Sequence, residues 1–158
     1  MSGAESETRP VLRVRDLQVA YGTVRGSLAA VDGVSFDLAP GESLGLVGES
    51  GCGKSTLGRG LMQLLPDGAA VGGSVELDGR QLIGLSRGEL RRVRSEELAL
   101  VFQEPMSRLN PLMKISSHFS ETIRTHRPEI DKDEARQMGR EALRQMGIPP
   151  TRVNDYPH

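Results

Sequence analysis

Apolar residues alternate with polar ones, or form nearly continuous runs, in several parts of the chain, and these patterns predict strands. The alternation slips at Arg15 and Asp16, where we expect a β-bulge. The pair Asp78-Gly79 indicates a two-residue hairpin turn, and residues 22–29 predict a loop. The predicted strands span residues 11–21, 34–38, 42–47, 74–77 and 98–102. The third and fifth are nearly continuous in apolar residues, which is typical of central strands in a parallel sheet.

Apolar residues spaced three and four apart predict four helices. One begins at Ser86, which forms a capping box with Glu89, and another begins at Asp131 and ends at Gly147. The helices span about 54–65, 87–94, 115–126 and 132–146. The buried face of the first is expected to carry Leu57, Leu61, Leu64 and Leu65, with Pro66 as its end. That of the last is expected to carry Ala135, Met138, Ala142 and Met146.

The segment between a predicted strand and a predicted helix, residues 48–56, reads Gly-Glu-Ser-Gly-Cys-Gly-Lys-Ser-Thr. It matches the phosphate-loop pattern G-x-x-x-x-G-K-[ST]. Glycines let the backbone curl until several N–H groups converge on a phosphate, and the start of the helix adds its positive dipole. Lys54 is expected to reach the β- and γ-phosphates, and the Ser55 hydroxyl to hold Mg²⁺. The rest of the cradle is Gly48, Gly51, Cys52, Gly53 and Thr56.

Composition restricts the classes of partner. The net charge of −1 favours neither nucleic acid nor an anionic membrane. The arginines at 87–94 are interpreted as a solvated helix face because no aromatic residues alternate with them. The single cysteine excludes an internal disulfide, residues 1–10 read as a disordered tail without a signal peptide, and no apolar stretch is long enough to span a membrane. We therefore expect a cytoplasmic protein.

Two residues outside the loop are candidates for nucleotide contacts. Tyr21 is predicted at the end of a strand, where its ring would stack on adenine; the alternative is an ordinary strand-end aromatic. Gln103 follows the predicted strand 98–102 at the edge of the sheet where α/β proteins bind ligands. Its amide would contact Mg²⁺ or orient a water molecule; the alternative is a polar strand terminator.

Three segments together resemble one protein family: GESGCGKST, the preceding AVDGVSFDLAPGESLGLV, and VFQEPMSRLNPLM. They resemble the ATP-binding subunits of ABC transporters, and EPMSRLNP with the closing DYPH is similar to the branch that imports oligopeptides, dipeptides and nickel. The resemblance implies an α/β P-loop fold of the ABC type in its N-terminal portion: an antiparallel β part, the phosphate-loop strand and helix, then a helical subdomain. Residues 11–105 would be the β-rich and P-loop part, and residues 106–158 the start of the helical subdomain.

The resemblance also implies roles for matching positions. Tyr21 would stack on adenine, and Gln103 would bind Mg²⁺ and sense the γ-phosphate. The cofactors would be ATP and Mg²⁺. Residues after Gln103 would contact membrane permease subunits, a second ATP-binding subunit would complete the assembly, and the protein would be peripheral at the cytoplasmic face of the membrane.

The chain also departs from the family pattern. Tyr156-Pro157-His158 resembles the lead-in to a Leu-Ser-Gly-Gly signature, but the 158 residues contain neither that signature, nor the strand ending in Asp-Glu, nor the switch histidine. We therefore expect an incomplete nucleotide-binding domain that does not hydrolyse ATP alone. The alternatives are a non-hydrolysing nucleotide-binding fragment and a P-loop ATPase of DNA maintenance, which the absence of a long coiled coil disfavours.

Overall fold

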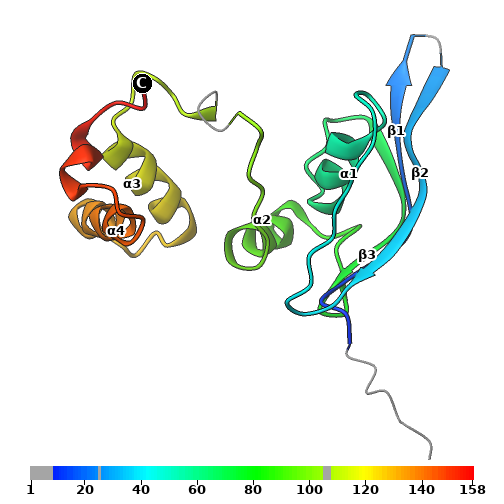
Figure 1. Ribbon diagram of the computed structural model, residues 1–158, viewed down its shortest axis with the longest axis horizontal. Helices are drawn as coiled ribbons and strands as arrows, with labels where there is room; N and C mark the ends of the chain where they lie inside the picture. Colours follow the sequence, from blue (N-terminus) through cyan, green and yellow to red (C-terminus); the bar gives the residue numbers. More distant parts are fainter. Residues whose placement is uncertain (1–8, 25, 105–107) are drawn as a thin grey trace, which may run out of the picture. The chain divides into compact units, whose positions relative to one another are not determined.

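The computed structural model describes residues 9–24, 26–104 and 108–158, and residues 1–8 of the expected tail at 1–10 therefore lie outside the described residues. The elements follow in the order β1 (Leu12–Thr23), β2 (Gly26–Leu38), α1 (Lys54–Leu61), β3 (Ala69–Leu77), β4 (Arg80–Gln81), α2 (Arg87–Glu96), α3 (Ile115–His126), α4 (Lys132–Gln145) and the 3-10 helix η2 (Pro150–Asn154) (Figure 1). They form two compact units, one ending at Leu98 and one beginning at Ala99.

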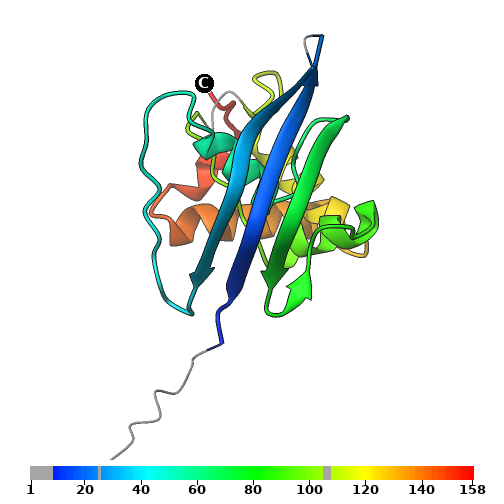
Figure 2. The same cartoon turned by 90° about the vertical axis from the view of Figure 1, so that its right-hand side faces the viewer.

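The first unit contains an antiparallel sheet with the strand order β2-β1-β3-β4, and Figure 2 shows its long strands side by side. The predicted bulge is confirmed, because the register between β1 and both neighbours shifts after Val14 and Arg15, and Asp16 has φ 47°. The Asp16 N–H donates to the Ser35 hydroxyl at 2.8 Å. A Cβ atom on Gly73 would lie 2.2 Å from the Asp16 carbonyl oxygen, so the bulge requires glycine on the facing strand.

Two predictions concern the connections between neighbouring strands of the sheet: a hairpin turn at Asp78-Gly79 and a loop at residues 22–29. Asp78 and Gly79 both have positive φ, 48° and 79°, as a type I′ hairpin turn requires, and this prediction is confirmed. The predicted loop at residues 22–29 is wrong for residues 22–23 and 26–29, because the pairing of β1 with β2 continues through Tyr21↔Leu28 to Thr23↔Gly26, and Val24 is left as a turn residue. Cross-strand hydrogen bonds outweigh the weak strand propensity of the glycines there.

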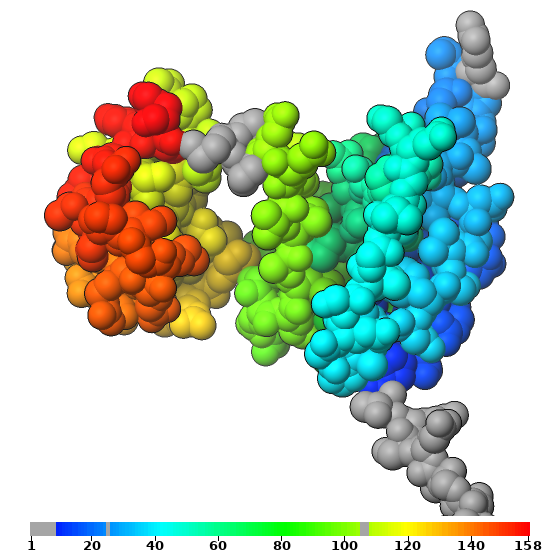
Figure 3. Space-filling view, viewed as in Figure 1, coloured from blue at the N-terminus to red at the C-terminus, as the bar shows by residue number. Residues whose placement is uncertain are grey.

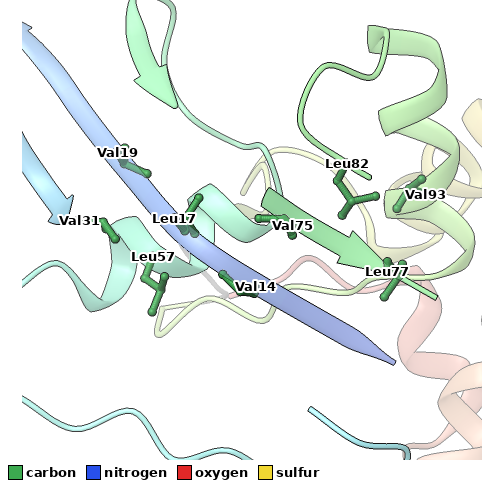
Figure 4. Packing of buried hydrophobic residues seen from close by; sticks show 9 residues of the cluster. All are labelled: Val14, Leu17, Val19, Val31, Leu57, Val75, Leu77, Leu82 and Val93. Atoms are coloured by element: carbon green, nitrogen blue, oxygen red, sulfur yellow. The ribbon is translucent and has the colours of Figure 1, made fainter. Parts of the chain in front are cut away.

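The core of the first unit lies between the sheet and α1, with α2 at its edge (Figure 4). The buried side chains come mainly from the two central strands and from α1 and α2. They are Val14, Leu17 and Val19 of β1, Val75 and Leu77 of β3, Leu57 of α1 and Val93 of α2, together with Val31 and Leu82. Val75 and Leu77 lie two apart in β3, with the partly buried Val71 four residues before Val75, as expected for a strand with one buried face. The core therefore fixes α1, and with it the phosphate loop, against β1.

The two predicted central strands are absent from the described residues. Residues 42–47 and 98–102 have no strand assignment. Val47 is 92% exposed and Val101 85% exposed, and Figure 3 shows the segment before α1, in cyan, at the surface. A parallel strand needs hydrogen-bonding neighbours for its N–H and C=O groups, and the described strands are all paired antiparallel with one another. An apolar run alone therefore did not make a strand.

The helix that follows the phosphate loop is shorter than predicted. It ends at Leu61, and Gln63 adopts the left-handed conformation with φ 52°. The Leu64 N–H donates to the Arg59 carbonyl at 2.8 Å, which is the closing hydrogen bond of a Schellman motif. Leu64 is consequently exposed, and the prediction that Pro66 ends the helix is wrong.

The second unit pairs α3 with α4 and adds η2. Residues 115–126 form a helix as predicted. Asp131 caps α4 by accepting from the N–H groups of Asp133 and Glu134, and Gly147, with φ 73°, ends it. The buried face of α4 was predicted wrongly for two residues, because Met138 and Met146 are 37% and 75% exposed.

Ala135 is buried as predicted, and α4 also buries Gly139 and Leu143, which follow it at intervals of four residues. A Cβ on Gly139 would lie 2.8 Å from Cγ of Phe119 on α3. The absence of a side chain at Gly139 thus lets the Phe119 ring pack against α4, and this close approach determines which face of α4 is buried.

Candidate nucleotide-binding site

The phosphate loop runs along the surface of the first unit and leads directly into α1. Gly51 and Gly53 have φ 86° and 95°, in the left-handed region that favours glycine. Gly53 is the N-cap residue of α1. A Cβ on Gly53 would lie 2.3 Å from the Ala30 carbonyl oxygen of β2. The loop backbone therefore lies directly against β2, and only glycine fits at residue 53.

Lys54 folds back over the loop that precedes it. Its ammonium group donates to the carbonyl oxygens of Gly48 and Glu49, at 2.7 and 2.6 Å. The Cys52 N–H donates to the Glu49 carbonyl at 3.3 Å, which closes the same turn. The sequence motif does not specify Glu49, yet its carbonyl accepts two of these hydrogen bonds. Lys54 and the turn it closes thus make one compact structure at the start of a helix.

The electrostatics of this structure favour an anion. The first turn of α1 contains no acidic residue, so its N-terminal dipole is not neutralised within that turn. The Lys54 ammonium group lies at the same place, and Gly51, Cys52 and Ser55 are exposed to solvent. A triphosphate has direct access to the loop, and the Ser55 hydroxyl is an oxygen donor of the kind Mg²⁺ prefers. Thr56 follows in α1 and is half-buried. The residues present therefore fit ATP and Mg²⁺.

Cys52 is a free, exposed cysteine within the loop. Its Sγ lies 3.5 Å from the Lys54 ammonium nitrogen, so a group attached to the sulfur would reach the phosphate cradle. A pocket of about 350 Å³ is lined by Cys52, Gly53 and Lys54 on one side and by residues of β2 on another. Its other lining residues are mostly apolar and include Val31, Leu46 and Val47, which leaves the exposed side of the loop as the place for phosphates.

Tyr21 lies inside β1, paired with Leu28 and Ala69, whereas the sequence predicted it at a strand-to-loop junction. It is half-buried against the core cluster. Two residues earlier, Val19 is fully buried in the same cluster as Leu57 of α1. Since side chains two apart in a strand share a face, Tyr21 lies on the face that carries α1 and the phosphate loop.

Gln103 is exposed in a bend and does not end a strand, because residues 98–102 form none. It belongs to the second unit, and Lys54 belongs to the first. Within the first unit, the structure brings together Gly48, Cys52, Gly53 and Lys54 and continues through Ser55 and Thr56 in α1.

Comparison with known families identifies the chain. The sequence model described as "ABC transporter" matches residues 31–158, which include the phosphate loop and Gln103. The chain belongs to the ABC transporter family. The antiparallel sheet, the phosphate-loop helix and the helical unit are the N-terminal portion of an ABC ATPase cassette, as the sequence predicted.

Curated ABC relatives carry transport names. The chain is 44% identical over 158 residues to the peptidoglycan transport ATP-binding protein YejF of Agrobacterium fabrum, covering 98% of this chain and 29% of that protein. It is 39% identical over 152 residues to the oligopeptide transport ATP-binding protein OppD of Bacillus subtilis, covering 94% and 42%. The chain thus spans less than half the length of these relatives.

Solved ABC cassettes share the fold. The dimeric cassette MJ0796 aligns with a TM-score of 0.73 at 22% identity, over 92% of this chain and 61% of that one. A second MJ0796 structure, described as a post-hydrolysis state bound to ADP and Pi, gives a TM-score of 0.74 at the same identity and coverage. None of the described helices is long and apolar enough to cross a membrane.

Proposed function

We propose that this chain is the ATP-binding portion of a subunit that couples ATP binding and hydrolysis to the import of peptides, or of nickel, through a membrane permease. The observation that carries the proposal is the glycine-rich loop at the start of α1, which the hydrogen bonds of Lys54 close. The names of the relatives, among them an oligopeptide transport protein, support the substrate class.

Each site residue has a role in this proposal. Lys54 and the N–H groups of Gly51, Cys52 and Gly53 bind the phosphates, with Gly48 and Thr56 completing the cradle. Ser55 and Gln103 are the Mg²⁺ ligands, and Gln103 also senses the γ-phosphate. Mg²⁺, when bound, neutralises charge on the phosphates during in-line transfer. Tyr21 stacks on the adenine ring, which contributes about 1–3 kcal/mol in comparable nucleic-acid contacts.

Two partners follow from the same proposal. Residues 106–113, of which 108–113 are described, contact the membrane permease, and a second ATP-binding subunit pairs with this one. The protein then lies peripherally at the cytoplasmic face of the membrane. A non-hydrolysing nucleotide-binding chain is a second candidate, favoured by the absence of a Leu-Ser-Gly-Gly signature from these residues.

Calorimetric titration with ATP and AMP tests the nucleotide site. The loop and Lys54 contact the β- and γ-phosphates in the proposal, so ATP is expected to bind much more tightly than AMP. Tyr21→Ala is expected to weaken ATP binding, and Tyr21→Phe, which keeps the ring, is the matched control. Equal affinities for ATP and AMP contradict the assignment of the loop.

Cross-linking tests the permease contact. The Asn110→Cys variant, in a Cys52→Ser background within the assembled transporter, is expected to form an adduct with the permease. Gln137→Cys, on the exposed surface of α4, is the control. The absence of an adduct from Asn110→Cys, with an intact transporter, rejects this placement.

A further inference from the structure

Arg108 lies over an aromatic ring next to Gln103. Its guanidinium carbon is 4.6 Å from the centroid of the Phe102 ring. Phe102 directly precedes Gln103 in the chain and is half-buried, while Arg108 and Gln103 are exposed. Both partners of this cation–π contact belong to the second unit. A cation at this distance is attracted to the face of a ring, so the contact restricts Phe102.

The chain just after Arg108 is held on α3. Asn110 organises a turn there, because its side-chain oxygen accepts from the Leu112 N–H at 3.0 Å and its carbonyl accepts from the Met113 N–H at 3.1 Å. The same carbonyl lies 3.2 Å from Nε2 of His118 in α3. Arg108 therefore extends from a hydrogen-bonded turn, and its contact with Phe102 ties the residue before Gln103 to the helical unit.

We propose that Arg108 is a positioning residue for Gln103. By holding Phe102, it limits the range of positions open to the adjacent Gln103 amide relative to α3. The proposal rests on the proposed function, in which Gln103 is a Mg²⁺ ligand. As a consequence, Arg108 increases the factor by which Mg²⁺ tightens ATP binding. The phosphate contacts of Lys54 do not depend on Arg108.

The ATP affinity of the full chain is measured with Mg²⁺ and again with EDTA. The quantity compared between variants is the ratio of the affinity with Mg²⁺ to the affinity with EDTA. Arg108→Ala is expected to lower this ratio about two- to fivefold, the size that an exposed cation–π contact supports, and to leave the EDTA affinity unchanged. Arg108→Lys keeps a cation and is expected to retain part of the ratio. The matched control is Arg140→Ala, since Arg140 is an exposed arginine on α4 with a 3.5 Å hydrogen bond to Gln137.

Adding Arg108→Ala to Gln103→Ala is expected to lower the ratio no further than Gln103→Ala alone, because a positioning residue acts only through the residue it positions. An unchanged ratio in Arg108→Ala, an additive double variant, or a Gln103→Ala variant with the wild-type ratio would each overturn the proposal.

An NMR measurement checks the contact without ATP. The Phe102 ring is expected to shift the Arg108 side-chain protons upfield, and Phe102→Leu to remove that shift. If the wild-type chain binds no ATP, the proposed function fails; if the upfield shift is also missing, the contact itself is refuted. Normal ATP binding with an unchanged ratio in Arg108→Ala refutes only the positioning role.

Discussion

The Lys54 ammonium group donates a 2.7 Å hydrogen bond to the carbonyl oxygen of Gly48, six residues earlier. The first glycine and the lysine of the phosphate-loop motif are thus in direct contact. This hydrogen bond, with its companion to Glu49, closes the loop and holds the charge of the lysine at the start of α1. The acceptor is a backbone carbonyl, so this contact depends on the Lys54 side chain and on its distance along the chain from residue 48.

Lys54→Ala is expected to lower ATP affinity by at least the ~1.5–3 kcal/mol of a charge-assisted phosphate contact. Calorimetry on both proteins measures the difference. Arg59→Ala, which removes an exposed positive charge from the last turn of the same helix, is the control and is expected to bind ATP normally. Identical affinities for wild type and Lys54→Ala would remove Lys54 from the site.

Cys52 reports directly on whether the loop is occupied. Its exposed thiol is expected to react with a maleimide, and the adduct to block ATP binding, because Sγ lies 3.5 Å from the Lys54 ammonium nitrogen. Saturating Mg-ATP is expected to slow the labelling. AMP at the same concentration is the control. Equal labelling rates with and without Mg-ATP argue against a nucleotide at the loop.

Gly139→Ala is expected to destabilise the chain. The added methyl group would meet Cγ of Phe119 at 2.8 Å, and such overpacking costs about 1–3 kcal/mol. This cost exceeds the gain of up to about 1 kcal/mol in helix propensity. Gly88→Ala in α2 is the matched control, because a Cβ there meets no atom within 4 Å. Thermal unfolding measures both variants, and a Gly139→Ala variant as stable as Gly88→Ala contradicts the packing.

The capping box of α2 is expected to make stability depend on pH. Hydrogen bonds from the Ser86 hydroxyl and the Ser86 N–H lower the pKa of Glu89 below its ordinary 4.5. A carboxyl whose pKa is lowered by folding stabilises the protein fully above its unfolded pKa, and this contribution is lost as the pH falls through the folded pKa.

Ser86→Ala is therefore expected to lower the thermal unfolding midpoint at pH 7. Below pH 4.5, the midpoint of this variant is expected to fall less steeply with pH than that of the wild type. Thermal unfolding across pH 3–7 measures this, with Ser95→Ala at the other end of α2 as the control. A decline of the same steepness in Ser86→Ala and wild type would show that the capping box is not its source.

A polypeptide of these 158 residues is expected to release phosphate from ATP no faster than its Lys54→Ala variant. In-line transfer needs a residue that orients or deprotonates the attacking water. No apolar strand ending in Asp-Glu follows Gln103 in this sequence, and no signature segment is present to cover a partner's γ-phosphate. Phosphate release by the monodisperse protein clearly above the Lys54→Ala level would prove this wrong.

The sequence by itself determined the features that depend on a few neighbouring residues. The capping box at Ser86, the cap at Asp131, the stop at Gly147 and the turn at Asp78-Gly79 all form as predicted. The phosphate loop belongs with them, since its shape depends on the φ angles of its glycines and on the short reach of Lys54 to its own loop. Such hydrogen bonds span at most a few residues, so the local sequence contains both partners.

The tertiary structure decided what depends on distant partners. Residues 42–47 and 98–102 have the composition of strands but pair with none of the described strands, whereas Gly22 and Thr23 do pair with Ser27 and Gly26. On α4, the packing of Phe119 against Gly139 buries a face that excludes Met138 and Met146. The free energy of strand pairing and of helix packing depends on which two surfaces meet. The composition of a segment indicates only that its surface is apolar, not which other surface covers it.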